Sequence, residues 1–206
     1  IFTFIDANRD GLAEEATDNP LDQAGEVIAF DTVSAAKIKP YLGVADNTLY
    51  GTLGMNLGAT QDTRVANIIA WVRGTDITNL RSRTLDGVTH RLGDIMHSTP
   101  VTVAKPTDQY HTLYNDRSYL EYWNATKHRE TMIYVGANDG MLHAFLASSG
   151  DEAWAFVPQS SLPKLADIAD TSYCHTYTVD LTPSVDDVRY DNAWHTVLVG
   201  GSSFYT

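Results

Sequence analysis

The strongest pattern along this chain is a period of two in apolar residues between positions 132 and 157. Ile133 and Val135 have the spacing of side chains on one face of a half-buried strand. The same period resumes at Leu142 and continues for two more alternate positions. Asn-Asp-Gly at 138–140 separates the two runs and tolerates positive φ, so we predict a β-hairpin here.

A third strand is expected directly after this hairpin. Ser149-Gly150 supplies the next turn, and Trp154 and Phe156 carry the alternation onward. A large aromatic side chain at this place can wedge between neighbouring sheets and bury on the order of 200 Å². Short antiparallel strands in this order indicate one blade of a β-propeller.

The length of the chain sets the extent of the propeller that it can form. A four-stranded blade takes roughly 40 to 50 residues and a ring needs several blades. The chain has 206 residues and no second good copy of the Asp-Gly-x-Leu-x-Ala phrase. We therefore predict a mainly β fold, a partial β-propeller with helical and loop insertions, in a fragment of a longer protein.

Periodicity elsewhere predicts further elements around the hairpin. Helical spacing is expected at 34–41, with Ser34 as its cap, at 62–73, with Asp62 as its cap, and at 160–169. Strands are expected at 2–5, 26–30, 99–103, 177–179, 184–190 and 194–199. Residues 1–90 should form a strand and helical segment that leads into the propeller, and 91–206 should form parts of two to three blades.

The blade region contains an aromatic-rich insertion at 107–129. Tyrosine and tryptophan dominate contact surfaces between proteins, so this insertion could be adhesive. Alternatively, it could cover the propeller by packing against it, and we prefer this second interpretation.

Composition and charge narrow the classes of function. Hydrophobic residues make up 43% of the chain, which supports a folded domain. The formal net charge of −12 argues against binding to nucleic acid or to anionic lipid. The sequence has no apolar stretch of the roughly 20 residues that a membrane helix needs. Its single cysteine, Cys174, cannot form an internal disulfide.

A candidate metal site follows the first expected strand. Oxygen-bearing residues at alternate positions, then a glycine and an acid, are what a Ca²⁺ ion with six to eight oxygen ligands requires. The predicted ligands are Asp6, Asn8, Asp10, Leu12 through its carbonyl, and Glu14. Position twelve of the loop is Thr17 and not the bidentate glutamate of an EF-hand, so either Glu15 or Asp18 could complete the set. The alternative is an ordinary turn, in which Asp, Asn and Gly are common.

Other candidates for chemistry are few. The seven histidines show none of the spacings of known zinc motifs. We expect His97 and His143 to make hydrogen bonds within the sheet. Asp94 and Asp139 should fix turns, since a carboxylate beside glycine can accept backbone N–H groups.

Three phrases taken together resemble one protein family. They are Leu92-Gly93-Asp94-Ile95-Met96-His97-Ser98-Thr99-Pro100, the hairpin phrase from Tyr134 to Phe145, and Trp194-His195-Thr196-Val197-Leu198-Val199-Gly200-Gly201. In this order they are similar to the C-terminal propeller region of PilY-type proteins of the bacterial type IV pilus. The match extends over roughly residues 91 to 201.

This resemblance implies a non-enzymatic protein at the bacterial cell surface, at the pilus tip or associated with the outer membrane or periplasm. Its implied partners are minor pilins of the type IV pilus machinery and a host or abiotic surface. Members of the family carry a calcium loop whose occupancy is linked to opposing pilus retraction, and that loop maps onto the Asp6 segment. The implied role is therefore support of pilus assembly, retraction control and surface attachment.

Two other functions also fit a propeller blade. The Asp-Gly-x-Leu-x-Ala phrase, with Gly150 and Trp154 after it, resembles the blade repeat of quinoprotein dehydrogenases. One repeat shows blade architecture and not cofactor binding, and the chain lacks the adjacent cysteine pair of that enzyme class. A propeller scaffold for assembling outer-membrane proteins would keep the blade, but it would not require the calcium loop.

Overall fold

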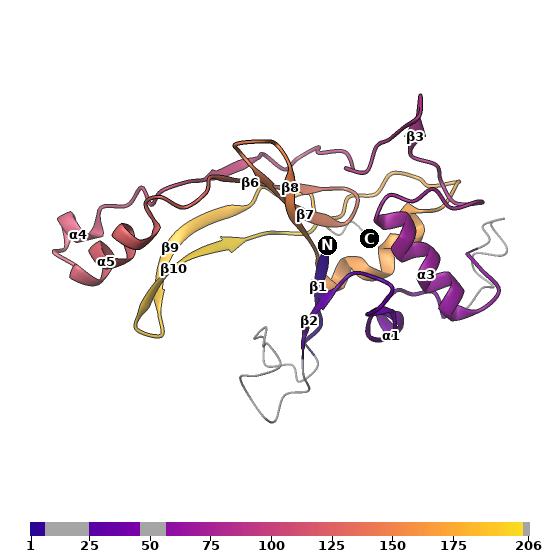
Figure 1. Cartoon of the computed structure of the whole chain (residues 1–206), viewed down its shortest axis with the longest axis horizontal. Coiled ribbons are helices and arrows are strands. Elements are labelled where there is room, and N and C mark those ends of the chain that lie inside the picture. Colours follow the sequence, from indigo (N-terminus) through magenta and orange to yellow (C-terminus); the bar gives the residue numbers. More distant parts are fainter. Residues whose placement is uncertain (7–24, 46–56, 204–206) are drawn as a thin grey trace.

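Ten strands, five α-helices and two 3₁₀ helices are seen in the computed structural model, which describes residues 1–6, 25–45 and 57–203 (Figure 1). The strands are β1 (Phe2–Phe4), β2 (Val27–Ala29), β3 (Thr84–Leu85), β4 (Val88–Thr89), β5 (Val101–Val103), β6 (Met132–Ala137), β7 (Met141–Leu146), β8 (Glu152–Val157), β9 (Ser184–Tyr190) and β10 (Ala193–Val199). The helices are α1 (Ala35–Ile38), η1 (Lys39–Tyr41), α3 (Gln61–Val72), α4 (Tyr110–Leu113), α5 (Arg117–Thr126), η2 (Gln159–Lys164) and α6 (Leu165–Ile168).

Four of these strands form the expected blade. β5, β6, β7 and β8 are consecutive neighbours in one sheet, and each is antiparallel to the one before it. The predicted hairpin is confirmed, because Ala137 pairs with Met141 across the turn at 138–140 and Gly140 has a φ of 91°. The blade is therefore predictable from the local pattern of the sequence, because each of its strands pairs with the next strand along the chain.

The sheet continues beyond the blade through the N-terminal strands. β1 pairs with β8 in parallel and β2 pairs with β1 antiparallel, so the six strands have the order β2-β1-β8-β7-β6-β5. The Thr3 hydroxyl is buried and donates to the carbonyl of Val157 at 2.7 Å. This extension covers the outer edge of the blade, which would otherwise expose unpaired backbone groups.

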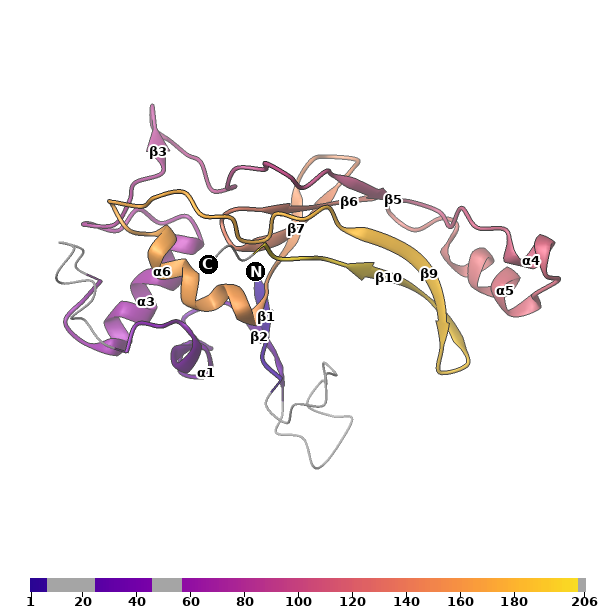
Figure 2. The same ribbon diagram turned by 180° about the vertical axis from the view of Figure 1, so that it is seen from behind.

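A second, two-stranded sheet consists of β9 and β10, which curve away from the blade as a long hairpin (Figures 1 and 2). Asp191 and Asn192 join the strands with φ values of 49° and 60°, a turn that Asp and Asn favour. β9 lies against β5 of the blade. The predicted strands at 184–190 and 194–199 are thus confirmed, while the described strands form no closed ring.

The fold class needs a correction, since the helices hold nearly as many residues as the strands. The fold is a mixed one, with a propeller blade at its centre. α3, η2 and α6 pack on one side of the blade, near its β6–β7 turn (Figure 1). Their apolar faces share one core with the strands, in which Trp71, Ile68 and Leu165 are fully or almost fully buried. Within the parts of the chain that the structure describes, no helix is long and apolar enough to cross a membrane.

Some predicted details are wrong for identifiable reasons. The cap of α3 is Thr60, whose side chain accepts the N–H of Thr63 at 3.2 Å, and not Asp62. Ser34 precedes α1 but makes no capping hydrogen bond with its side chain. Residues 177–179 form no strand, because Thr178 donates its N–H to the side chain of Asn138 instead of to a neighbouring strand.

Candidate functional site

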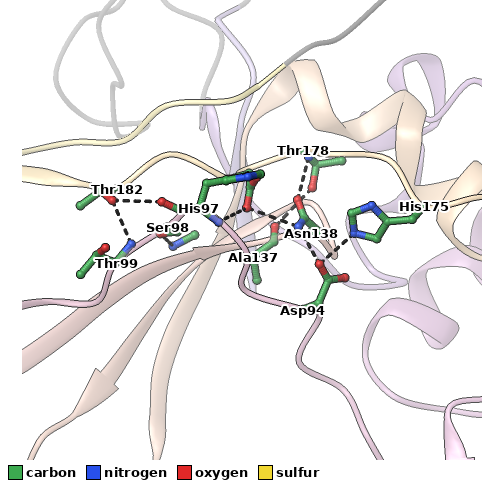
Figure 3. Close-up of polar contacts among 11 residues, drawn as sticks. Asp94, His97, Ser98, Thr99, Ala137, Asn138, His175, Thr178 and Thr182 are labelled. Carbon is green, nitrogen blue, oxygen red and sulfur yellow. Dashed lines mark hydrogen bonds and ion pairs between the residues drawn. The ribbon is translucent and has the colours of Figure 1, made fainter.

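A partly buried polar network lies where three segments of the chain meet beside the β6–β7 turn. The segments are 94–99, the end of β6 with its turn, and 175–182 (Figure 3). Asn138 is the centre of this network. Its amide nitrogen donates to Asp94 at 2.8 Å and to Asp180 at 3.3 Å, and its amide oxygen accepts the N–H of Thr178 at 3.0 Å. One buried side chain thus joins all three segments.

Two histidine–carboxylate hydrogen bonds flank Asn138. His175 donates to Asp94 at 2.8 Å, and His97 contacts Asp180, whose side chain is fully buried. Burial alone would raise the pKa of Asp180, but hydrogen bonds from the ring and main chain of His97 outweigh it and lower that pKa. The pKa of Asp94 is likewise lowered, because Asn138 and His175 outweigh burial. Both carboxylates are therefore ionised at neutral pH, and the hydrogen bonds that they accept are strengthened by their negative charge.

A second buried charge lies inside the blade at His143. Its ring donates to Glu152 at 2.6 Å and to Asp139 at 3.1 Å, and its side chain is only 3% exposed. Burial lowers the pKa of His143, yet the hydrogen bonds with Asp139 and Glu152 outweigh it and raise the pKa to about 9. Asp139 also accepts the N–H of Gly93 at 2.8 Å.

These contacts test what the sequence predicted for Asp139, His143 and His97. Asp139 fixes its turn as predicted, and His143 makes its hydrogen bonds within the sheet as predicted. His97 does not, since its partner is a loop carboxylate, Asp180. The roles of Asn138 and Asp180 were missed, because sequence spacing gives no sign that residues more than 40 positions apart are in contact.

The network holds segments together and offers no evident reaction chemistry. Among the described residues, no group of three or more His, Cys, Asp and Glu side chains could hold a metal ion. Cys174 is exposed and free. The arrangement instead fastens the loop before β5 and the loop before β9 to the blade.

The predicted calcium loop belongs to the connection between β1 and β2. Asp6, two residues after β1, is the only predicted ligand that the structure describes, and Asn8, Asp10, Leu12 and Glu14 lie outside the described residues. The N–H of Ile5 donates to the carbonyl of Glu26 at 3.0 Å, which brings the two ends of the connection together. Glu26 is a buried carboxylate that the motif did not include.

The aromatic insertion forms α4 and α5, which pack on the β9–β10 hairpin. Tyr119 is fully buried and its hydroxyl donates to Asp187 at 2.8 Å. Trp194 donates its indole N–H to Ser118 at 3.0 Å. The preferred interpretation, packing, is correct for these residues, whereas Tyr114 is 74% exposed.

A protein-family model described as the PilY1 beta-propeller domain matches residues 92–204, which is more than half of the chain. The chain belongs to the PilY1 β-propeller family. The match covers β5 to β10 together with α4 to α6, and it includes every residue of the Asn138 network. The resemblance drawn from the three sequence phrases is thereby confirmed.

Relatives of this PilY1-family chain are pilus proteins. It is 38% identical over 149 residues to the type IV pilus biogenesis factor PilY1 of Pseudomonas aeruginosa strain UCBPP-PA14, covering 68% of this chain and 12% of that protein. It is 41% identical over 114 residues to a PilY1 homolog of Xylella fastidiosa, covering 53% of this chain and 9% of that protein. The chain thus spans about a tenth of the length of these relatives.

A solved structure, the C-terminal domain of Pseudomonas aeruginosa PilY1, is also similar. It shares 38% sequence identity with this chain over 47% of this chain and 19% of that one, with a TM-score of 0.36. The names of the relatives describe biogenesis factors of the type IV pilus, and this chain is a PilY1-like region of that kind.

Proposed function

We propose that this PilY1-like region is a non-enzymatic, calcium-binding part of a pilus-associated surface protein. In this proposal the whole protein supports pilus assembly, retraction control and surface attachment, together with minor pilins and outside the cytoplasm. The family match over residues 92–204 carries the proposal. The names of the relatives, type IV pilus biogenesis factors, agree with it.

The calcium part of the proposal rests on the β1–β2 connection. Asp6, Asn8, Asp10 and Glu14 would supply side-chain oxygens and Leu12 its carbonyl, a donor set that suits a hard divalent cation. Glu26 adds a buried carboxylate at the end of the connection, next to Ile5. When bound, the ion neutralises these carboxylates, which otherwise repel one another.

Calcium at this place would act on the outer edge of the blade. Both ends of the connection enter strands of the six-stranded sheet, and β1 is paired directly with β8. Calcium bound to the connection would therefore act on a surface that is attached directly to the blade. Such a surface can bind a pilus component in one state of calcium occupancy and release it in the other.

Calcium titration of the 206-residue chain tests the site itself. We expect calorimetry to show saturable Ca²⁺ binding in the micromolar range, as in sensor loops, and much weaker binding of Mg²⁺. Asp6→Ala should abolish this binding, whereas Asp151→Ala, which removes a carboxylate from the exposed β7–β8 turn, should leave it unchanged. Equal calcium affinity in the Asp6 variant and the parent would refute the ligand assignment.

The role in retraction is tested in the full-length protein in its own bacterium. Asp6→Ala should reduce the number of surface pili, and deletion of the retraction motor should restore them, because the variant can no longer oppose retraction. Asp151→Ala should assemble pili normally. If Asp6→Ala leaves both pilus number and motility unchanged, calcium does not regulate retraction through this loop.

A further inference from the structure

A cationic pocket lies between the end of α3, the segments that flank the β3–β4 hairpin (81–83 and 90–94) and the β6–β7 turn of the blade. Its volume is about 260 Å³, and its lining includes Trp71, Arg81, Arg83, Arg91 and Asp139. The chain as a whole carries 14 Lys and Arg residues against 26 Asp and Glu residues. Three arginines in one small cavity are therefore a local reversal of the overall charge.

Two of these arginines are held rigidly by the ends of neighbouring helices. Arg81 donates its Nε–H to the carbonyl of Ile168 at 2.9 Å, and its guanidinium lies 4.5 Å from the ring centroid of Tyr173. Arg83 donates to the carbonyls of Trp71 and Arg91 through its two terminal nitrogens. Its guanidinium also lies 3.9 Å from the Trp71 ring centroid. The positions and orientations of these two guanidinium groups are thus fixed before a ligand binds, which lowers the entropic cost of binding.

The third arginine owes its position to a glycine. Gly74 follows α3 with a φ of 100°, and a Cβ atom there would lie 2.1 Å from Nε of Arg91. Arg91 can therefore lie across the end of the helix only because residue 74 has no side chain. The side chain of Arg91 is exposed, so solutes can reach it.

These arginines retain unused hydrogen-bond donors. A guanidinium carries five N–H groups, and among the described residues Arg81 uses one nitrogen, Arg83 uses two and Arg91 uses none. In particular, Nε of Arg83 is buried and contacts no acceptor within the described part of the chain. A buried donor left without an acceptor is costly, so the Arg83 guanidinium is a group that an anion beside its remaining terminal N–H groups would stabilise.

The carboxylates in the wall of the pocket already have their own partners. Asp139 accepts from the backbone of Gly93 and from His143, and Asp94 accepts from Asn138 and His175. Counting the formal charges of the arginines and aspartates in the lining, three arginines and two aspartates leave a net charge of about +1. This charge suits a singly charged anion better than a phosphate dianion. Forked guanidinium groups also match the geometry of a carboxylate.

We propose that this pocket binds a carboxylate, with Arg81, Arg83 and Arg91 as the groups that recognise it. The carboxylate comes either from a free small acid or from an acidic side chain on a protein partner. Both sources present the same two oxygens to the arginines. This site is separate from the β1–β2 connection, so it does not depend on calcium binding.

The experiment follows the arginine Nε–H resonances of the full chain by NMR. The probes are sodium acetate as a free acid and a short Gly-Ser peptide with a single glutamate as a displayed side chain. Sodium chloride at equal ionic strength is the reference. We expect a saturable shift of the Arg83 and Arg91 resonances with acetate, with the glutamate peptide or with both, and none with chloride. A response to one probe alone identifies the source of the carboxylate, and identical responses to acetate and chloride overturn the proposal.

Arg91→Gln provides the matching variant, because the Arg91 guanidinium makes no hydrogen bond within the described residues and its loss should not unfold the chain. We expect the affinity of this variant for the effective probe to fall about tenfold, as loss of one charge-assisted contact predicts. The affinity of Arg91→Lys should lie between those of the parent and Arg91→Gln. Lysine keeps the positive charge but lacks the planar guanidinium that can donate two parallel hydrogen bonds. Arg117→Gln, which removes an exposed charge at the start of α5, should bind like the parent. Unchanged affinity in Arg91→Gln would overturn the assignment.

Discussion

At the scale of single residues, the most unusual feature of the blade is a buried positive charge on a strand. His143 is nearly inaccessible to water, yet its two carboxylate partners keep it protonated at neutral pH. An unpaired charge at this position would be strongly destabilising. The imidazolium joins the β6–β7 turn, through Asp139, to the start of β8, through Glu152.

The raised pKa of His143 predicts how stability depends on pH. The pKa is about 9 in the folded chain and 6.5 for an ordinary histidine, so the stabilisation is fully present below pH 6.5 and is lost as the pH rises through 9. The shift corresponds to about 3 kcal/mol of unfolding free energy. Urea unfolding between pH 6 and pH 10 measures this loss, and NMR titration of the His143 ring measures the pKa directly.

Substitution of one histidine isolates this effect. His143→Gln should be less stable at pH 6 and should show a much smaller loss of stability from pH 6 to pH 10. His128→Gln removes an exposed histidine and should follow the pH dependence of the parent. If His143→Gln and the parent lost the same free energy over this range, the charge on His143 would not be responsible.

At the scale of elements, the docking of α5 on the β9–β10 hairpin is centred on the buried side chain of Tyr119. Tyr119 is fully buried against Trp194, with ring centroids 4.9 Å apart, and donates to Asp187. We expect Tyr119→Ala to destabilise this docking by about 3–5 kcal/mol, the usual cost of removing a buried aromatic ring. Amide hydrogen exchange should then rise throughout α5 while the β6–β8 amides stay protected.

Tyr114 gives a matched control for this prediction. It lies in the same insertion and is 74% exposed. Tyr114→Ala should change stability by less than about 0.5 kcal/mol and leave exchange in α5 unchanged. Similar exchange in both variants would show that Tyr119 does not hold the insertion.

The elements also show which kinds of inference from sequence succeed. The hairpins at 138–140 and 191–192 were predictable, because a turn signal between two alternating runs is a local property. The parallel pairing of β1 with β8 was not, because it joins residues about 150 positions apart. The Asn138 network and the arginine pocket were missed for the same reason, since their members come from separate segments that only the fold brings together.

At the scale of the whole molecule, the N-terminal segment and the blade share one core. Ile28, Ile68 and Trp71 from the first part of the chain belong to the same buried cluster as Ala155 and Val157 of β8. A continuous core favours unfolding in a single cooperative transition. The division near residue 90 that the sequence suggested should therefore not appear as two separate unfolding steps.

A core substitution tests this cooperativity. Ile68→Ala should lower the unfolding free energy by about 2–5 kcal/mol. The most protected amides of β6 to β8 should lose the same amount of protection, although they lie in another part of the sequence. Val33→Ala, at a position that is 91% exposed, should change neither quantity. Unaltered protection of the blade in Ile68→Ala would mean that the two parts unfold independently.

The parallel pairing of β1 with β8 also has a mechanical consequence. Phe2 is opposite Phe156 and Thr3 is opposite Val157, so both strands run in the same direction along their shared ladder. A pulling force that enters at the N-terminal end of β1 and leaves at the C-terminal end of β8 slides the strands along each other. The contacts of the ladder then carry the load together and do not open one after another. The sheet therefore resists tension along the chain more strongly than an antiparallel hairpin pulled apart at its open end.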